Sequence, residues 1–177
     1  PTRRSSDLYM DTDPSPAASD FTCAALTYDG HKGTDFALPT LADMHSGVDV
    51  IASAPGTVVA LRDGMPDTGL TPETAASIEN RECGNGVVIS HGGGWQTQYC
   101  HMKQGSIIVE KGRRVATGTV LGEVGMSGRA QFPHVHLSIR KNGKPVDPFD
   151  PDGEITCGIP STETLWQQPP AINPAGC

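Results

Sequence analysis

Histidine and aspartate stand four positions apart twice within a short stretch of this sequence. Residues 31–50 read HKGTDFALPTLADMHSGVDV, so His-x-Gly-x-Asp occurs once as His31 and Asp35 and again as His45 and Asp49. An imidazole and a carboxylate at this spacing can bind one metal ion. The spacing by itself is weak evidence, because it also arises by chance, and its duplication leaves open which pair forms the site.

Two other stretches can bring histidines together. The sequence HVH at 134–136 has a strand pattern, in which side chains alternate, so both imidazoles are expected on one face. In WQTQYCHM at 95–102, Tyr99 and His101 are expected to share a face, while Cys100 points to the other face. Neither motif is specific alone, because surface histidines on a strand have the same pattern.

A groove lined by His101, His134 and His136, together with one His-x-Gly-x-Asp pair, would hold the residues of a hydrolytic zinc site. A catalytic zinc needs three protein ligands and an open position for water, and two histidines with one aspartate supply the ligands. The two remaining histidines can move protons and stabilise the oxyanion that forms when water attacks a carbonyl. His91, in SHGGG, is more typical of a turn residue.

The composition favours many short strands joined by turns. The 177 residues include 21 glycines and 15 prolines, and glycine separates nearly all of the strand-like runs. We predict an all-β fold, mainly an antiparallel sheet that forms a small barrel or sandwich with a metal groove. GVDVIASAPGTVVAL should form two strands that turn at Pro55-Gly56. One short helix is expected over 72–80, inside an insert at 62–83, because Thr71 and Pro72 supply a cap and a first helical residue.

The domain organisation follows from the polarity of the two ends. Residues 1–20 are polar and aperiodic and are predicted to be a disordered tail or an appended extension. The folded domain is predicted over 21–157, with a C-terminal extension at 158–177. No window of 18 apolar residues is present, so we expect no membrane span, and we expect any export signal to have been removed.

Charge and cysteine content limit the partners and the compartment. Lysine and arginine number 13 against 20 acidic residues, a net charge of −7 with no basic run, which argues against nucleic-acid binding. The five cysteines fit no CxxC pair or zinc-knuckle spacing, so we expect disulfides in the periplasm or outside the cell. Cys83 with Cys100 is the favoured bridge, because a hairpin built on the turn GNG would bring them together, and Cys23 with Cys157 is a second candidate. We expect a monomer.

Four segments, in order and spacing, resemble the LytM/lysostaphin-type zinc endopeptidases, peptidase family M23. They are HKGTDFA, GNGVVISHGGGWQTQYCHM, VEKGRRVATGTVLGEVGMSG and FPHVHLSIRKNGKPVDP, and they cover most of residues 30–150. The resemblance implies a β-rich fold whose groove holds Zn²⁺, and an enzyme that cuts peptide cross-links or stems of bacterial peptidoglycan. On the same basis, 21–157 is a LytM-like metallopeptidase domain.

The resemblance also implies a role for individual residues. It assigns His31, Asp35 and His136 to the metal, and His101 and His134 to catalysis. Asn85 and Tyr99 are further candidates for contact with the substrate. After the HVH motif many family members carry phenylalanine and glutamate, where this chain has Leu137 and Ser138.

Three alternatives remain open at this point. His45 and Asp49 could replace His31 and Asp35 at the metal; the sequence favours the first pair, because HKGTDFALP fits the family motif over more positions than HSGVDV. In that case LPTLADMHS is a short insertion with Thr40 as a helix cap. The domain could instead be a non-catalytic member that binds cell wall or activates another hydrolase. Glycine-containing bridges, or glycine-rich proteins such as elastin, are alternative substrates.

Overall fold

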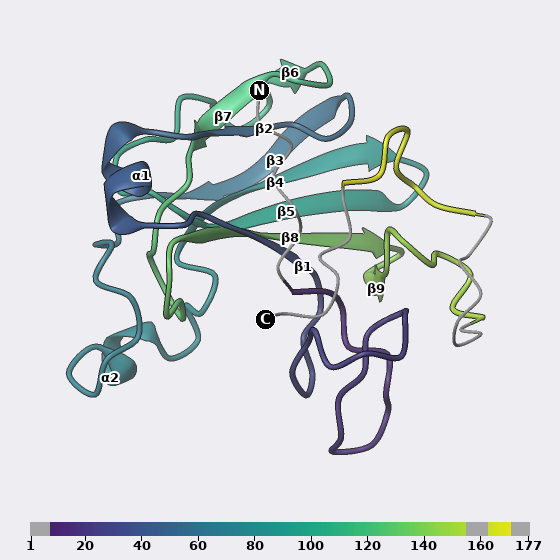
Figure 1. Ribbon diagram of the computed structural model, residues 1–177. Coiled ribbons are helices and arrows are strands. Elements are labelled where there is room, and N and C mark those ends of the chain that lie inside the picture. Colours follow the sequence, from purple (N-terminus) through teal and green to yellow (C-terminus); the bar gives the residue numbers. More distant parts are fainter. Residues whose placement is uncertain (1–7, 155–162, 171–177) are drawn as a thin grey trace.

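The protein is built on one large antiparallel sheet and one small one (Figure 1). The computed structural model describes residues 8–154 and 163–170. The large sheet has 7 strands in the order β1-β8-β5-β4-β3-β6, with β9 paired to β8, and the small sheet pairs β2 with β7. The strands are β1 Thr34–Ala37, β2 Asp49–Ile51, β3 Gly56–Arg62, β4 Asn85–Gly92, β5 Trp95–Met102, β6 Arg114–Val115, β7 Val120–Glu123, β8 His134–Lys141 and β9 Lys144–Val146. The predicted all-β, mainly antiparallel fold is confirmed.

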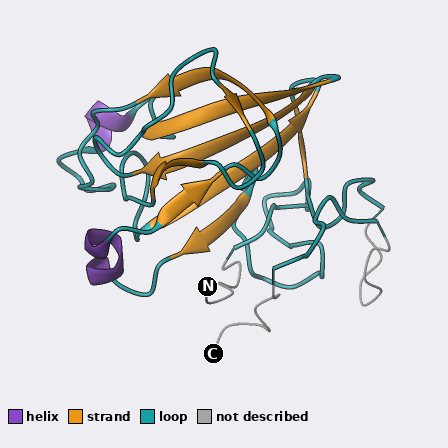
Figure 2. Ribbon diagram, turned by 90° about the horizontal axis from the view of Figure 1, so that it is seen from above, coloured by secondary structure: helices purple, strands orange, loops and turns teal. Residues whose placement is uncertain are grey.

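Two short helices are present among the described residues, and both views place them at the same end of the large sheet (Figures 1 and 2). The helix α1, Leu41–Ser46, begins after Thr40, whose side-chain oxygen accepts the Asp43 N–H at 3.1 Å. This is the N-cap that the sequence predicted. The helix α2, Ala75–Ile78, lies inside the predicted 72–80 but is shorter, because residues 72–74 form a turn instead.

The hydrophobic core lies between one face of the large sheet and the layer formed by β2, β7 and α1. Side chains alternate across a strand, so each central strand sends every second residue into this core and the others to the opposite face. The core residues are Leu38, Met44, Val50, Ala52, Val58, Val87, Ile89, Tyr99, Met102, Val109, Val115, Leu121, Val124, Leu137 and Ile139. The opposite face of β5 and β8 is therefore available for polar chemistry.

The predicted hairpin around Pro55-Gly56 does not form. β2 pairs with β7 in the small sheet, whereas β3 pairs with β4 and β6 in the large one. The segment between β2 and β3 thus carries the chain from one layer of the core to the other. Local alternation predicts each strand but cannot distinguish a hairpin from two strands in different sheets.

The hairpin β4–β5 turns at Gly93-Gly94, where both residues have positive φ, and not at GNG. Even so, its antiparallel pairing brings the two ends together, and a disulfide joins Cys83 to Cys100, the bridge that the sequence favoured. Cys23 is also disulfide-bonded. The predicted partner, Cys157, lies outside the described residues.

The segment 8–27 is folded onto the domain, so the expected tail over 1–20 is wrong from residue 8 onward. Figure 1 shows this segment in purple below β1 and β9. Tyr9 is fully buried, and its ring makes edge contacts with Phe21 and with Phe149, which stack on each other at 4.8 Å. Leu8 forms a bridge with Asp35. Irregularly spaced anchors such as these carry no periodic signal in the sequence.

A buried carboxylate beside this aromatic cluster predicts a gain of stability on substitution. Asp147 is 3% exposed, its Oδ1 accepts the Phe149 N–H at 2.9 Å, and its Oδ2 has no hydrogen bond among the described residues. Burial, with the nearby charges of Asp150 and Asp20, raises the pKa of Asp147 to about 6. The folded state therefore holds this proton more tightly than the unfolded state, and stability is lost as the pH rises from about 4 to about 6.

Asp147→Asn is therefore expected to raise the free energy of unfolding by about 1–3 kcal/mol at pH 8 and to change it little at pH 4. Urea denaturation at both pH values measures this difference. Asp49→Asn, at an exposed position on β2, is the control and should have little effect at either pH. A loss of stability in Asp147→Asn at pH 8 would contradict the electrostatic cost assigned to this carboxylate.

Candidate metal centre

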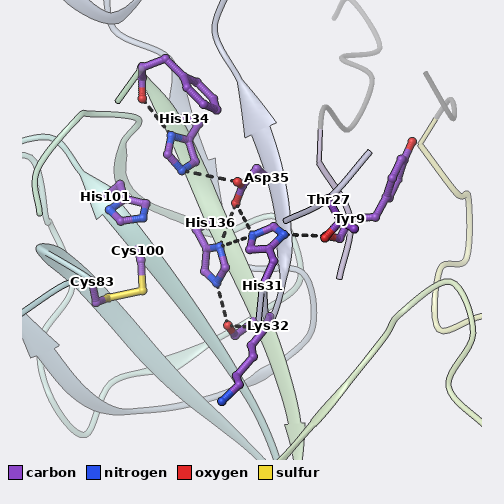
Figure 3. Close-up of polar contacts among 12 residues, drawn as sticks. Tyr9, Thr27, His31, Lys32, Asp35, Cys83, Cys100, His101, His134 and His136 are labelled. Carbon is purple, nitrogen blue, oxygen red and sulfur yellow. Dashed lines mark hydrogen bonds and ion pairs between the residues drawn. A yellow bond between two sulfur atoms is a disulfide. The ribbon is translucent and has the colours of Figure 1, made fainter. Parts of the chain in front are cut away.

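Three side chains from two adjacent strands converge on the polar face of the large sheet. His31 Nε2 lies 3.2 Å from Asp35 Oδ1 and 3.1 Å from His136 Nδ1, and His136 Nδ1 lies 2.8 Å from Asp35 Oδ1 (Figure 3). Asp35 on β1 pairs directly with His136 on β8, while His31 precedes β1 by three residues. The group is one that could hold a metal ion.

The hydrogen bond of His31 fixes which of its nitrogens carries the proton. His31 Nδ1 lies 2.5 Å from the backbone oxygen of Tyr9, which can only accept, so Nδ1 donates. His31 Nε2 therefore presents a lone pair to Asp35 and His136. The backbone of segment 8–27 thus sets the tautomer of a candidate ligand.

His136 is oriented in the same manner by a serine. Ser138 Oγ donates to the backbone oxygen of Lys32 at 2.8 Å and lies 2.9 Å from His136 Nε2. Because the serine proton is committed to Lys32, the His136 Nε2–H donates to Oγ, and Nδ1 carries the lone pair. Partners of this kind are typical of metal-binding histidines, whose second nitrogen is held by a neighbouring polar group.

When both rings are neutral, the three donor atoms therefore meet with lone pairs and with no hydrogen among them. Such an arrangement is unfavourable unless a cation joins the atoms, and two imidazoles with one carboxylate match the ligands of a catalytic zinc. His31 and Asp35 are each 2% exposed, so hydrogen bonds from water cannot fully offset the repulsion among these lone pairs. The residues present fit a divalent metal ion.

Gly33 explains the glycine of the first motif. A Cβ atom at this position would lie 2.6 Å from the Leu137 backbone oxygen and 2.7 Å from the His136 ring. Such contacts are far shorter than van der Waals distances, so any side chain would displace β8 from β1. The glycine therefore allows the ligands of the two strands to approach.

Asp35 is ionised in this environment. Burial by itself would raise its pKa, but His136 and His31, which donate to the carboxylate when their rings are protonated, and the charge that His136 and His134 then carry outweigh burial and hold the pKa well below the ordinary aspartate value. The carboxylate therefore contributes a full negative charge to the group at neutral pH.

Two more histidines flank the three donors. The rings of His101 and His134 lie 4.6 Å apart, and His134 Nε2 lies 3.7 Å from Asp35 Oδ2. His101 Nδ1 donates to the Ser127 backbone oxygen at 2.8 Å, and His134 Nδ1 donates to that of Phe132 at 2.8 Å. Both Nε2 atoms therefore carry lone pairs, and Figure 3 shows the two imidazoles on the same side of Asp35 and His136.

Burial keeps both flanking imidazoles neutral. Desolvation, followed by the charge of His134, lowers the pKa of His101 to about 3, and desolvation also lowers the pKa of His134. Each imidazole can thus accept a proton at neutral pH.

The position of His101 corrects the predicted strand geometry. Regular alternation would place His101 with Tyr99, but His101 has φ of 61° and turns toward His136 instead. Its backbone N–H donates to the Cys83 oxygen at 2.8 Å, which supports this left-handed conformation. Cys100 pairs with His136 in register, so the disulfide lies beside the site and does not point away from it. A non-glycine residue with positive φ at such a position is typical of functional sites.

The rival His45/Asp49 pair is not at the site. His45 is exposed on the last turn of α1, and Asp49 is exposed on β2, in the small sheet. The group that could hold a metal among the described residues contains neither. His91 lies at the end of β4 and contacts Pro55 and Thr97 instead.

Asn85 and Tyr99 are not placed to contact a substrate, which corrects that prediction. Asn85 is fully buried, and its amide bonds the backbone of Met65 and Met102. Tyr99 is 3% exposed, and its hydroxyl bonds Ser53 in the core. Their role is to join the 62–84 connection and the small sheet to β5.

Sequence reasoning missed the residues that orient the ligands. Ser138 had a usable signal, because it shares a face with His134 and His136 in an alternating strand. The Tyr9 carbonyl had no sequence signal, since any residue supplies a backbone oxygen.

Ser138→Ala is expected to weaken metal binding by about 10- to 100-fold, because it removes the acceptor that holds the His136 Nε2–H. Competition with a chromophoric chelator measures this affinity. Ser90→Ala, a matched change on β4, should leave the affinity unchanged. Equal affinities for Ser138→Ala and the parent protein would show that Ser138 does not orient His136.

Comparison with known proteins finds relatives among peptidoglycan peptidases. ShyA of Vibrio cholerae, a peptidoglycan DD-endopeptidase, is 32% identical over 133 residues, which are 75% of this chain and 25% of ShyA. Mpg of Neisseria meningitidis, a DD-carboxypeptidase/endopeptidase, is 33% identical over 118 residues, or 64% of this chain and 24% of Mpg. This chain therefore spans about a quarter of the length of these curated relatives.

Solved structures share the fold. The catalytic domain of the prophage-encoded M23 protein EnpA from Enterococcus faecalis superposes with a TM-score of 0.57 and 24% identity, covering 86% of this chain and 92% of that one. A chain of the SpoIIQ–SpoIIIAH pore-forming complex superposes with a TM-score of 0.56 and 25% identity, covering 82% of each chain. Among the described residues, neither helix has the length and apolar character needed to cross a bilayer. Because the model of Peptidase family M23 matches residues 29–148, the greater part of the sequence, the chain belongs to this peptidase family.

Proposed function

We propose that this protein is a zinc-dependent endopeptidase that hydrolyses peptide bonds of bacterial peptidoglycan. The observation that carries the proposal is the convergence of three lone-pair donors, His31, Asp35 and His136, beside two neutral imidazoles whose Nε2 atoms are free of protons. These are the elements that hydrolysis by activated water requires.

Each residue of the site has a defined task in this proposal. His31, Asp35 and His136 would hold Zn²⁺, which supplies a Lewis acid for the scissile carbonyl and lowers the pKa of a water molecule. One of the imidazoles of His101 and His134 removes the proton of the attacking water through its Nε2 lone pair, and the other, once protonated, stabilises the oxyanion by donating its Nε2–H. The Ser127 and Phe132 carbonyls engage the Nδ1–H of the two rings, so Nε2 is the atom that accepts a proton and, once protonated, can donate.

The substrate class is supported by the relatives named above, which are peptidoglycan endopeptidases. The bonds that such enzymes cut join stem peptides, and we propose stem cross-links as the substrate in preference to glycine bridges or glycine-rich proteins. The disulfide between Cys83 and Cys100 is consistent with work in an oxidising compartment, and we propose the periplasm or the cell exterior.

A non-catalytic role is the second candidate. A structural neighbour belongs to a pore-forming complex, which shows that this fold also occurs in assemblies. Against this role, all five groups needed for hydrolysis are present and oriented in this chain. A domain used only for binding has no need of the two flanking imidazoles.

The test is a digest of purified diaminopimelate-type peptidoglycan, analysed by mass spectrometry. The zinc-loaded protein should convert cross-linked dimers to monomers, whereas the chelator-treated protein and His134→Gln should not. Restoration of cleavage by added Zn²⁺ excludes irreversible damage by the chelator. Intact dimers in all samples, with a zinc-loaded and folded protein, would leave the binding role as the better account.

A further inference from the structure

The cleft beside the metal donors is cationic, although the protein as a whole carries a net charge of −7. A cavity of about 270 Å³ is bounded by His31 and His136 on one side. Its lining includes the cations Lys32, Arg129 and Arg140 but only one acid, Glu82. A local excess of positive charge on an acidic protein attracts anionic groups to that cleft.

Arg140 is positioned for recognition. It follows His136 by four residues on β8, so both side chains lie on the same face of the sheet. Its guanidinium donates to Gln98 Oε1, and the Gln98 amide in turn donates to Cys83 Sγ at 3.2 Å. These contacts hold the guanidinium in the cleft and leave most of its five N–H donors available.

The positive charge of this cleft is not neutralised by ion pairs. Within residues 8–154 and 163–170, the only lysine or arginine in an ion pair is Lys103, which lies elsewhere. The backbone N–H of Arg129 donates to the Glu82 backbone oxygen at 2.8 Å, and backbone hydrogen bonds, together with the charge of Arg129, lower the pKa of the Glu82 carboxyl, so a negative charge is close to Arg129. Arg140 and Lys32 are therefore the stronger candidates to bind an anion.

A second cavity, of about 370 Å³, adjoins the first and shares His101 and Arg129 with it. Its other lining residues include Asp35 and His134 and the apolar residues Leu8, Leu70 and Phe132. Figure 3 shows the Lys32 side chain extending away from His134 and Asp35, on the far side of His136. Lys32 and Arg140 line only the first cavity, so the half of the cleft that holds them is the more cationic one, and the half that holds Leu8, Leu70 and Phe132 is the more apolar one.

The distances suit a peptide that crosses the donors from one half to the other. Four residues of strand place Arg140 about 13 Å from His136 along β8. An extended peptide advances about 3.3–3.6 Å per residue, so a carboxylate within about three residues of the scissile bond comes within reach of the Arg140 side chain. A chain of glycines alone offers no such group.

We propose that Arg140, assisted by Lys32, forms a carboxylate-binding subsite that selects peptides bearing a free carboxylate on one side of the scissile bond. This inference rests on the proposed endopeptidase function, and it adds which substrates the cleft selects. The guanidinium binds a carboxylate through two parallel hydrogen bonds, which a carboxamide cannot accept in the same manner.

The test uses two cross-linked stem-peptide dimers that differ only in the diaminopimelate group, which is a free carboxylate in one and a carboxamide in the other. The parent protein should show a kcat/KM ratio of about 10 to 100 in favour of the carboxylate, the range of a charge-assisted hydrogen bond. Arg140→Gln should reduce the ratio to near one. Lys144→Gln, on β9 and outside the cleft, should retain it.

A second variant keeps the test valid if Arg140→Gln does not fold. Gln98→Glu places a carboxylate against Arg140 without truncating it, so it should also reduce the ratio. A parent ratio near one, or a ratio unchanged in both variants, would overturn the inference while leaving the endopeptidase intact.

Absence of cleavage of either dimer would instead contradict the proposed function. Calorimetry then measures the binding of the free and the amidated stem tripeptides, and it tests the carboxylate-binding subsite separately from hydrolysis. Tighter binding of the free tripeptide to the parent than to Arg140→Gln supports the inference, and equal binding of both tripeptides overturns it.

Discussion

Replacing His31 with alanine is expected to remove the bound metal ion and to reduce hydrolysis to the level of the chelator-treated protein, whereas the same replacement at His45 should change neither. The two residues are a matched pair, because each begins a His-x-Gly-x-Asp sequence. Only His31 lies among the converging donors, and the variant leaves two ligands where a catalytic zinc needs three.

Metal content of the purified variants, measured by mass spectrometry and normalised to protein, checks this result. Because His31 is buried, thermal unfolding should accompany the measurement, so that loss of metal is separated from loss of fold. Loss of metal in His45→Ala and its retention in His31→Ala would show that the second motif is the metal site.

Replacing either flanking histidine is expected to lower kcat by about 100- to 10,000-fold and to leave the metal bound, because these residues move protons or stabilise charge and do not ligate. We choose His101→Asn because residue 101 has φ of 61°, and asparagine tolerates this conformation better than most residues. His134→Gln serves for the second position, which lies in a regular strand.

The control is His91→Gln, since His91 contacts Pro55 and Thr97 away from the cleft and should retain full activity. Single-turnover kinetics with zinc-saturated proteins separates chemistry from product release. A variant that loses zinc in parallel with activity would show that its histidine is a ligand, and a variant with unchanged kcat would remove that residue from the catalytic pair.

Much of the candidate site could be predicted because its motifs are local. His-x-Gly-x-Asp and His-x-His each place two groups within a few residues, and strand alternation puts His134 and His136 on one face without reference to the remainder of the chain. The same local rules predicted the Thr40 cap and the strands of the β4–β5 hairpin. The order of the strands in the sheet determines which motifs come together, and local rules do not predict that order.

The errors have a common physical origin. Regular alternation predicts the faces on which Tyr99 and Cys100 lie, and the positive φ of His101 ends that regularity at a residue proposed to be catalytic. Residues 8–20 lack periodicity, which predicts a tail, yet buried aromatic contacts attach them to the domain and the Tyr9 carbonyl bonds His31. Such contacts join residues far apart in the sequence and leave no local pattern.

The sequence by itself determined the β-rich class of this protein, the inventory of imidazoles and carboxylates and the pairing of Cys83 with Cys100, because composition, strand period and motif spacing are local properties. Only the tertiary structure separates His31 from His45, since both begin the same motif and only His31 lies in the group that could hold a metal ion. It also decided the tautomers, through carbonyls and a serine that any folded chain can offer but that only one fold brings within hydrogen-bonding distance.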